Sequence, residues 1–299
     1  MASAMSAPRD QHPQVDLAAP GAAGGAIEWA DVAPGVIVVA TGDGSWLHRP
    51  APVWGWDPFT QPMQTLGSLE TTANLLDGAL AAGRGVGPDP ASGLASTLIG
   101  YVWWLVGAYR TTHATPALME EASRRFAEAG RDLLAEYAAQ KAREEAGHHA
   151  LALRDLRALG YRAEGLVEAL VPMKSAAMVA YFAASVRADD PVGCVGYVYA
   201  LERLAATIGA ETVKRVEGMI PAGIRATRCL RVHSSVGADP SHVRDGLRLV
   251  AALSAEERVR VATACFQTAR TIFGRAEEPG DAELRRRVSA FRDGPSGPR

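Results

Sequence analysis

The chain has 299 residues, of which 48% are hydrophobic and 21% charged, so it can bury the core of one large helical domain or two small ones. A formal charge of −2 at pH 7 provides no broad basic field, and a nucleic-acid partner is therefore not expected. The three cysteines, Cys194, Cys229 and Cys265, form no C-x-x-C pair, which argues against a disulfide scaffold or a thiolate zinc site and fits a reducing cytoplasm.

The first 60 residues are predicted to be a flexible or irregular segment. Residues 1–44 are dominated by Ala, Gly and Pro, with at most a short extended piece at "GVIVVAT", and they lack the cationic head and apolar run of a secretory signal. Residues 46–64 place three tryptophans among prolines. This pattern indicates an irregular segment over the core with the tryptophans as anchors, and a substrate lid is the alternative.

Residues 61–285 show the periodicity of amphipathic helices almost without interruption. The predicted helices cover residues 69–83, 92–109, 116–159, 163–172, 174–190, 192–209, 211–221, 222–235 and 239–276, the last range holding one or two helices. Pro116 is expected at the first position of its helix and Gly160 just after the end, while Asp239 is expected to cap the last range. Residues 286–299 are predicted to be a disordered tail.

This pattern predicts an all-α fold, built as a single helical bundle of about eight helices without internal repeats. The most apolar run, at residues 97–109, is too short to cross a membrane and is interpreted as a core helix. We therefore expect a soluble, cytoplasmic protein with a small-molecule substrate, no membrane partner, and a homodimer as one option for its assembly.

The stretch "REEAGHHALALRDL", residues 143–156, carries the first candidate metal ligands. On a continuous helix, Glu145 and His148 share a face with Cβ atoms roughly 5–6 Å apart, which suits one metal ion. Iron and manganese sites use this mixture of carboxylate and imidazole, and Glu-x-x-His steps occur in di-iron bundle cores. The same step also occurs on solvated helix faces, so further ligands are needed.

Two other segments offer such ligands. Glu202 lies in a largely apolar helix, so its carboxylate should bind a partner, and an ordinary ion pair with an arginine is the alternative. The segment "RVHSSVGADPSH" supplies His233, Asp239 and His242, the last two on one face of the helix that begins there. Together with Glu145 and His148, these side chains are enough for two metal ions.

The order of "E-x-x-H", "GYVYALE" and "VHSSVGADPSHV" resembles the haem-oxygenase-like di-iron oxidases, also called iron-containing redox enzymes, over residues 118–253. The resemblance implies a haem-oxygenase-like bundle whose core helices hold two Fe(II) ions per chain. Members of this family activate O2 for desaturation, carbon–carbon cleavage or N-oxygenation of small amino acids and fatty acids, often in natural-product biosynthesis. The implied ligands, which are also the implied catalytic residues, are Glu145, His148, Glu202, His233, Asp239 and His242.

The last motif departs from the family's pattern. Five residues separate His233 from Asp239, where the family has three between its first histidine and its aspartate. Either the insertion bulges out and the side chains still converge, or Ser235 takes the histidine's position and the site is altered. Asp155, two turns after His148, is interpreted as either a partner of the ligands or a surface residue.

The resemblance also implies the class of substrate, a small amino acid or a related carboxylate. Lys174, Tyr181 and Arg231 are the candidate substrate-binding residues, with solvated or core-packing roles as the alternative.

Two rival functions remain open from the sequence. A metal-free thiaminase-like or cofactor-independent enzyme of the same fold would need a cysteine nucleophile, and the cysteines have no adjacent histidine in the sequence. A non-enzymatic helical binding protein would instead leave Glu145, Glu202 and His242 exposed and apart.

Overall fold

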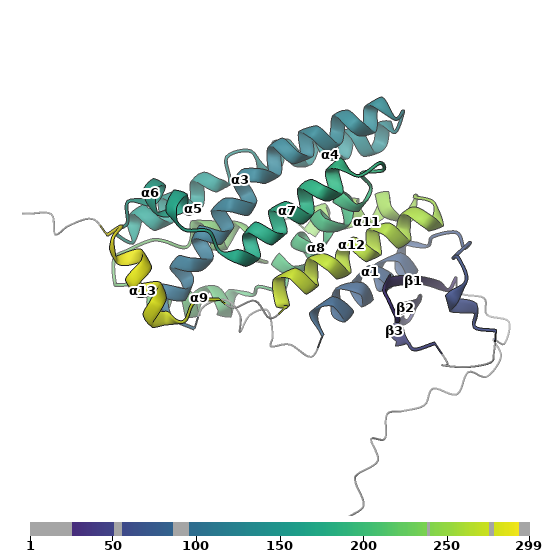
Figure 1. The fold of residues 1–299 in the computed structure, drawn as a ribbon, viewed down its shortest axis with the longest axis horizontal. Coiled ribbons are helices and arrows are strands. Elements are labelled where there is room, and N and C mark those ends of the chain that lie inside the picture. The colour runs from purple at the N-terminus through teal and green to yellow at the C-terminus, as the bar shows by residue number, and fades with distance from the viewer. Residues whose placement is uncertain (1–25, 51–55, 86–95, 238–239, 275–277, 293–299) are drawn as a thin grey trace, which may run out of the picture.

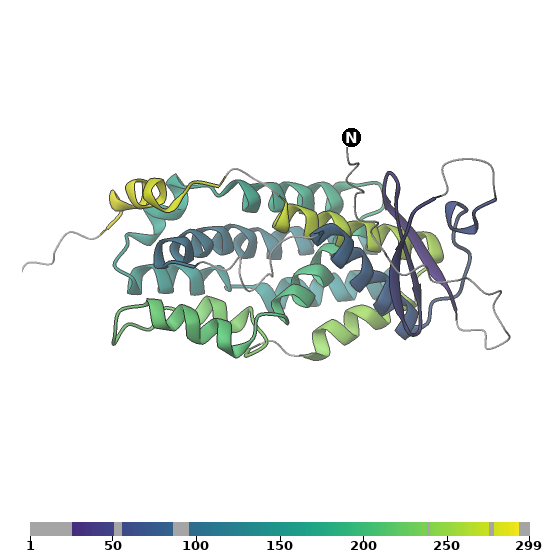
Figure 2. The ribbon, with the colours of Figure 1, turned by 90° about the horizontal axis from the view of Figure 1, so that it is seen from below.

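The computed structural model describes residues 26–50, 56–85, 96–237, 240–274 and 278–292, and the side chains of 240–242 are outside this description. The strands and helices are, in chain order, β1 (Glu28–Ala33), β2 (Val36–Thr41), β3 (Gly44–His48), α1 (Leu69–Arg84), α3 (Leu98–Glu128), α4 (Asp132–Glu145), α5 (His149–Ala158), α6 (Ala163–Ala169), α7 (Met173–Arg187), α8 (Gly193–Ala205), α9 (Ala210–Met219), α10 (Arg228–Val232), α11 (Pro240–Ala251), α12 (Ala255–Phe273) and α13 (Asp281–Ser289). They form an elongated helical bundle with a small sheet at one end and α13 at the other (Figures 1 and 2). The predicted helical bundle is confirmed.

The extended piece predicted at residues 35–41 is strand β2, but it belongs to a sheet and not to a flexible or irregular segment. Residues 28–48 form a three-stranded antiparallel sheet in the order β1-β2-β3. The first turn is tight, with Gly35 at φ 73°, a conformation that glycine adopts without a steric penalty. Trp46 and Trp56 are 41% and 81% exposed, so these two tryptophans are not the predicted anchors.

The sheet is attached to the bundle through packing and one buried ion pair. It packs on α1 and α12, where Gly78 of α1 approaches the sheet so closely that an added Cβ would lie 2.7 Å from Val38. The Glu28 carboxylate of β1 lies 3.0 Å from the Arg258 guanidinium of α12, and both side chains are almost wholly buried. These contacts supply the stability that the short strands lack by themselves.

The long helix predicted over 116–159 is divided among three helices. Pro116 lies inside α3 rather than at a helix start, and α3 ends before Gly130, which has φ 70°. The chain breaks again at Gly147, with φ 84°, between α4 and α5. The predicted end at Gly160 is confirmed, with φ 81° just after α5.

Two hydrophobic clusters lie along the bundle. The first joins the sheet to α1, α4, α7, α8, α11, α12 and the C-terminal half of α3. The second joins the N-terminal half of α3 to α5, α6, α9, α10 and α13. Within the first cluster, α8 and α12 approach closely at Gly196, where an added Cβ would lie 2.3 Å from the carbonyl oxygen of Val261.

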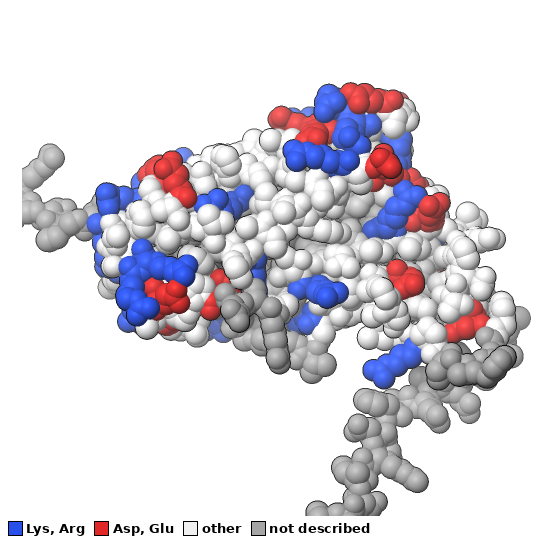
Figure 3. Space-filling view, in the orientation of Figure 1, with Lys and Arg blue, Asp and Glu red and all other residues white. Residues whose placement is uncertain are grey.

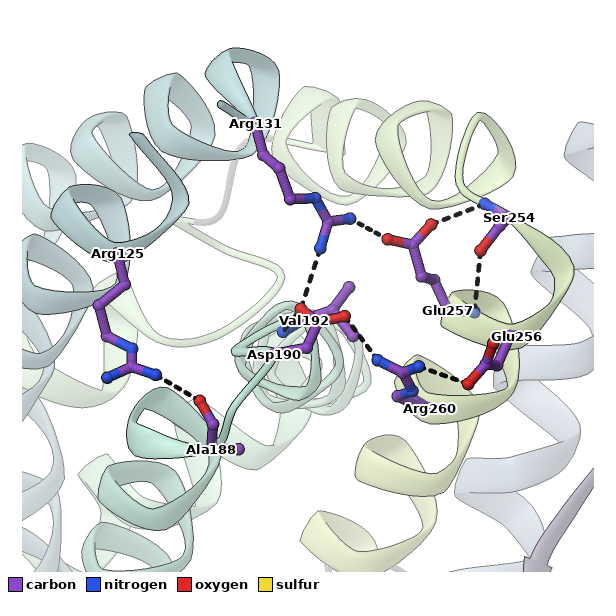
Figure 4. Close-up of polar contacts among 9 residues, drawn as sticks. All are labelled: Arg125, Arg131, Ala188, Asp190, Val192, Ser254, Glu256, Glu257 and Arg260. Atoms are coloured by element: carbon purple, nitrogen blue, oxygen red, sulfur yellow. Dashed lines mark hydrogen bonds and ion pairs between the residues drawn. The ribbon is translucent and has the colours of Figure 1, made fainter. Parts of the chain in front are cut away.

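A polar network fixes the turn between α3 and α4 (Figure 4). Asp190, in the loop before α8, accepts hydrogen bonds from Arg131 at 2.9 Å and from Arg260 of α12 at 2.5 Å. Arg131 also pairs with Glu257, which forms the capping box of α12 with Ser254. The start of α4 is thereby held against α8 and α12.

Charged side chains gather over the α3–α4 turn and over α13, with a broad uncharged band between them across α7 (Figure 3).

Within the described ranges, no single helix has both the length and the apolar character of a membrane span, although α6 and α7 pass such a test together across a 74° bend. The predicted homodimer stays a prediction.

Candidate metal centre

Three of the predicted ligands come together where the two hydrophobic clusters meet. Glu145 is the last residue of α4, His148 precedes α5, and His233 follows α10. One ligand atom from each lies within 4.8 Å of the others. Glu145 Oε2 is 3.0 Å from His148 Nδ1 and 3.9 Å from His233 Nε2, and the two imidazole rings are nearly perpendicular.

Glu145 and His148 do not lie on the continuous helix that we predicted for them. After Glu145 the chain turns through Gly147, which has φ 84°, and the His148 amide donates to the Glu145 carbonyl at 3.2 Å. This tight turn, rather than a helical face, brings the imidazole of His148 to the carboxylate. A residue with a side chain is strained in this left-handed conformation, so glycine is suited to the position.

His233 is positioned by a buried carboxylate on α5. Asp155 is fully buried and accepts hydrogen bonds from the Cys229 amide at 2.8 Å and from Arg228 at 3.1 Å. Burial of its carboxyl raises the pKa of Asp155. The residue is therefore not on the surface. Its described hydrogen bonds hold the start of α10, the helix that ends next to His233, so it supports this ligand indirectly.

The hydrogen bonds of His233 leave one ring nitrogen available to a metal. Its Nδ1 lies 2.9 Å from the Cys229 carbonyl oxygen, which can only accept, so Nδ1 carries the proton. Its Nε2 is buried and has no hydrogen-bond partner among the described residues. A buried ring nitrogen without a hydrogen-bond partner beside a carboxylate fits a bound cation, which would displace the proton that Nε2 otherwise carries, and metal-ligating histidines commonly donate their other N–H to a carbonyl.

The electrostatics of the cluster also favour a cation. Burial raises the pKa of Glu145, but the nearby His148 and His233 imidazoles outweigh burial and lower the pKa to about 2. Burial lowers the pKa of His233, whereas its hydrogen bond to Cys229 and the nearby Glu145 carboxylate raise it to about 10, so the imidazole is a cation when no metal is bound. Glu145 is therefore ionised at neutral pH, and each of the three side chains still exposes about a quarter of its surface.

Glu202 does not join this cluster through any contact described for it. Its carboxylate lies 2.7 Å from the ammonium of Lys141, which also pairs with Glu144 at 2.9 Å. The arginine that follows it, Arg203, pairs with Asp77 instead. Sequence reasoning missed Lys141, although a lysine within the alanine-rich run of α4, one turn before Glu145, was a signal of a buried partner.

The remaining predicted ligands cannot be placed as side chains. Asp239 lies outside the described residues, as does the side chain of His242. Their helix, α11, does begin at Pro240 as predicted.

The predicted substrate-binding residues have other contacts. Lys174 donates to the Ile272 carbonyl at 3.0 Å, and Arg231 pairs with Glu217 at 2.7 Å. Tyr181 packs against the first hydrophobic cluster. Their roles in substrate binding stay predictions.

The cysteines offer little support for a thiol nucleophile. Cys194 and Cys265 are fully buried, and burial raises the pKa of both thiols, that of Cys194 to about 12. Contrary to the expectation that no histidine lies beside a cysteine, the Cys229 sulfur is 3.8 Å from His233 Nδ1. That nitrogen, however, donates its proton to the Cys229 carbonyl and is not free to act as a base.

Comparison with known proteins decides the family. The family model described as "Iron-containing redox enzyme" matches residues 102–274. The chain belongs to the iron-containing redox enzymes. It is similar to a solved domain of unknown function with a heme oxygenase-like fold from Shewanella denitrificans OS217, with 20% identity and a TM-score of 0.51 over 67% of this chain and 87% of that chain.

A second solved structure, a TenA homolog from Pseudomonas syringae pv. tomato DC3000, has 14% identity and a TM-score of 0.49 over 71% of this chain and 95% of that chain. No curated protein matches the sequence. The Shewanella structure shows the haem-oxygenase-like fold of this iron-containing redox enzyme. Within the described residues, Glu145, His148 and His233 form the group that could hold its metal.

Proposed function

We propose that the protein is an O2-dependent non-haem iron oxidoreductase. The observation that carries the proposal is the donor set of Glu145, His148 and His233, whose ligand atoms lie within 4.8 Å of one another. Two imidazoles and one carboxylate with open coordination positions are the donor set of non-haem Fe(II) oxygenases. Iron bound by this set supplies the binding and activation of O2.

The surrounding residues orient the ligands and keep one side accessible. The Cys229 carbonyl holds His233 in the tautomer that presents Nε2, and Asp155 fixes the helix that carries it. Glu145 and His148 each expose more than a quarter of their side chain, so the centre is in contact with solvent.

The proposed substrate is a small amino acid or a related carboxylate, and the reaction is a desaturation, cleavage or oxygenation, as in natural-product pathways. The family resemblance supports this class of substrate, with Lys174, Tyr181 and Arg231 as the residues to test. The same resemblance implies two Fe(II) ions per chain. The first is accounted for by the Glu145 cluster, whereas a second would require Glu202, Asp239 and His242.

Anaerobic loading with ferrous iron tests this function. We expect the wild-type protein to retain iron after desalting and to consume O2 when O2 is added, and we expect Glu145→Gln to lose both properties. Glu136→Gln, an exposed carboxylate on the same helix, is the matched control and should behave as wild type. Equal iron retention by wild type and Glu145→Gln would overturn the proposal, as would bound iron that leaves O2 unconsumed.

A further inference from the structure

We infer that Lys141 takes the place of a second metal ion, so that the protein has a mononuclear centre at Glu145, His148 and His233. The inference rests on the proposed function for the first ion. It concerns the number of ions and the residue that sets this number, and it departs from the two Fe(II) ions that the resemblance implies.

The position of Lys141 carries the inference. It lies on α4 one turn before Glu145, so the two side chains share a helix face. Lys141 is only 4% exposed, and its Nζ is 2.7 Å from Glu202 Oε1 and 2.9 Å from Glu144 Oε2. The ammonium therefore bridges a carboxylate of α8 to one of α4 in the interior of the bundle.

A second dication at Glu202 would compete with this ammonium. A metal ion approaches a carboxylate oxygen to about 2.0–2.2 Å, where a lysine nitrogen already lies at hydrogen-bond distance. Two cations on one carboxylate repel each other strongly in a partly buried site. Displacing Lys141 from Glu202 instead would leave its buried ammonium with Glu144 as the one described carboxylate partner, which is unfavourable.

The charges of the region balance with one ion. Glu144, Glu145 and Glu202 bring three negative charges, and Lys141 with one ferrous ion brings three positive charges. A second ferrous ion would leave an excess of two positive charges, and ionised Asp239 could reduce this excess only to one. A cluster inside a protein is stable when its charges are paired, so one ion fits this set of residues.

The chain geometry after α10 supports the same conclusion. In the family's pattern, the last histidine-aspartate-histidine motif lies on one helix. Here α10 ends at Val232 and α11 begins at Pro240, so His233 and His242 belong to different segments. His233 lies with Glu145 and His148, and not on the helix that begins at Pro240.

Counting bound metal tests the inference without relying on activity. Apo-protein is titrated with ferrous iron under argon, desalted, and analysed for iron per chain, with the dissociation constant measured by calorimetry. We expect one iron per wild-type chain, and Glu202→Gln should retain one iron with an unchanged dissociation constant. Two irons per wild-type chain, or an affinity lost by about tenfold or more in Glu202→Gln, would overturn the inference and leave the proposed function standing.

The charge of Lys141 is tested by Lys141→Met, which keeps most of the aliphatic stem. We expect this variant to bind more than one iron per chain, because the cation that pairs with Glu202 and Glu144 is removed. Lys214→Met removes an exposed lysine of α9 and should keep a count of one. A count of one in Lys141→Met would show that the lysine does not exclude a second ion. If Lys141→Met does not fold, Glu202→Gln still decides the inference. Absence of iron from the wild type would remove the proposed function first.

Discussion

His233 depends on its neighbours for both its position and its protonation. The Cys229 carbonyl fixes the proton on Nδ1, and Glu145 lies on the Nε2 side. His149 is adjacent in sequence to another ligand, His148, but its ring packs against His113 and Tyr109 on α3. The side chains of these two adjacent histidines therefore point in different directions, as expected from the rotation of roughly 100° per residue along a helix.

This difference predicts the effect of removing each imidazole. His233→Ala deletes a ligand, and we expect the affinity for ferrous iron to fall by at least about 100-fold. His149→Ala is the matched control and should leave the affinity within a factor of about two. Calorimetric titration under argon measures both, and similar losses in the two variants would contradict the ligand assignment.

Because Lys141 is buried and paired with carboxylates, we expect the free energy of unfolding to depend on pH in the alkaline range. Burial lowers its pKa, but the nearby Glu202 and Glu144 carboxylates outweigh burial and raise it above 10.5. A raised pKa means that the stabilisation is fully present below pH 10.5 and is lost as the pH rises through the folded-state value. In metal-free protein, Lys141→Met should lower the free energy of unfolding by about 1–3 kcal/mol at pH 8, because it removes the hydrogen bonds of the ammonium to two partly buried carboxylates.

Above pH 10.5 the gap in unfolding free energy between wild type and Lys141→Met should narrow. Urea unfolding at pH values from neutral to strongly alkaline measures this gap, and the subtraction removes the titration of all other groups. A gap that does not change with pH would mean that the charge of Lys141 does not stabilise the fold.

Residue types and order, together with the family resemblance, predicted Glu145, His148 and His233 among six ligands, and these three lie together in the structure. The sequence was not enough to predict the partner of Glu202, for which we considered an arginine. The partner of a carboxylate inside a bundle is the side chain that reaches it from a neighbouring helix. Lys141 of α4 reaches Glu202 of α8, and such a tertiary contact cannot be predicted from the local sequence.

At the scale of elements, the breaks between helices position the metal ligands. Glu145 ends α4, His148 precedes α5 and His233 follows α10. Each ligand thus sits at a helix end, where the backbone can turn a side chain toward a common point. The α4–α5 break depends on Gly147, whose φ of 84° is in the left-handed region.

Replacing Gly147 should weaken both the fold and the metal site. We expect Gly147→Ala to lower the free energy of unfolding by about 1–2 kcal/mol, because a Cβ is strained in the left-handed conformation. If the chain relaxes toward a continuous helix, the His148 ring moves relative to Glu145 and iron affinity falls. Gly218→Ala, in the last turn of α9 where an added Cβ meets no atom within 4 Å, should instead stabilise the protein slightly, by at most about 0.5–1 kcal/mol. Urea unfolding and iron titration check both variants.

The helices were predictable because their apolar residues recur with helical period, whereas the breaks at Gly130 and Gly147 were not. A single glycine inside a helical pattern lowers helix stability only slightly, so local sequence does not indicate whether the helix continues. Among the N-terminal strands, only β2, which is rich in Val and Ile, was expected as a short extended piece. The short strands β1 and β3 show no clear pattern by themselves, and the sheet is stabilised by packing on α1 and α12.

At the scale of the whole molecule, the N-terminal sheet is part of the folded core. Glu28 and Arg258 form a buried pair 3.0 Å apart, and Arg258 also donates to the Thr65 carbonyl at 2.8 Å. The same guanidinium reaches the Leu253 carbonyl at the end of the turn that precedes α12. One side chain therefore connects three segments that are far apart in the sequence.

This connection predicts that removing one partner of the Glu28–Arg258 pair destabilises the protein more than removing both. Glu28→Met should lower the free energy of unfolding by about 3–5 kcal/mol, because it leaves the Arg258 charge buried without a partner. The double variant Glu28→Met with Arg258→Met should recover much of this loss, since no uncompensated charge remains. Urea unfolding of the single and double variants measures the coupling, and a loss below about 1 kcal/mol in the single variant would indicate a sheet that is independent of the bundle.

Helix α3 contributes buried side chains to both hydrophobic clusters, Leu105 to one and Met119 to the other. When heat or denaturant unfolds one half of the bundle, α3 loses contacts that also stabilise the other half. The two halves should therefore unfold in one cooperative transition. Glu145 belongs to a helix of one half, and His233 follows a helix of the other. An ion bound by both residues would therefore link the two halves and should raise the temperature at which they unfold together.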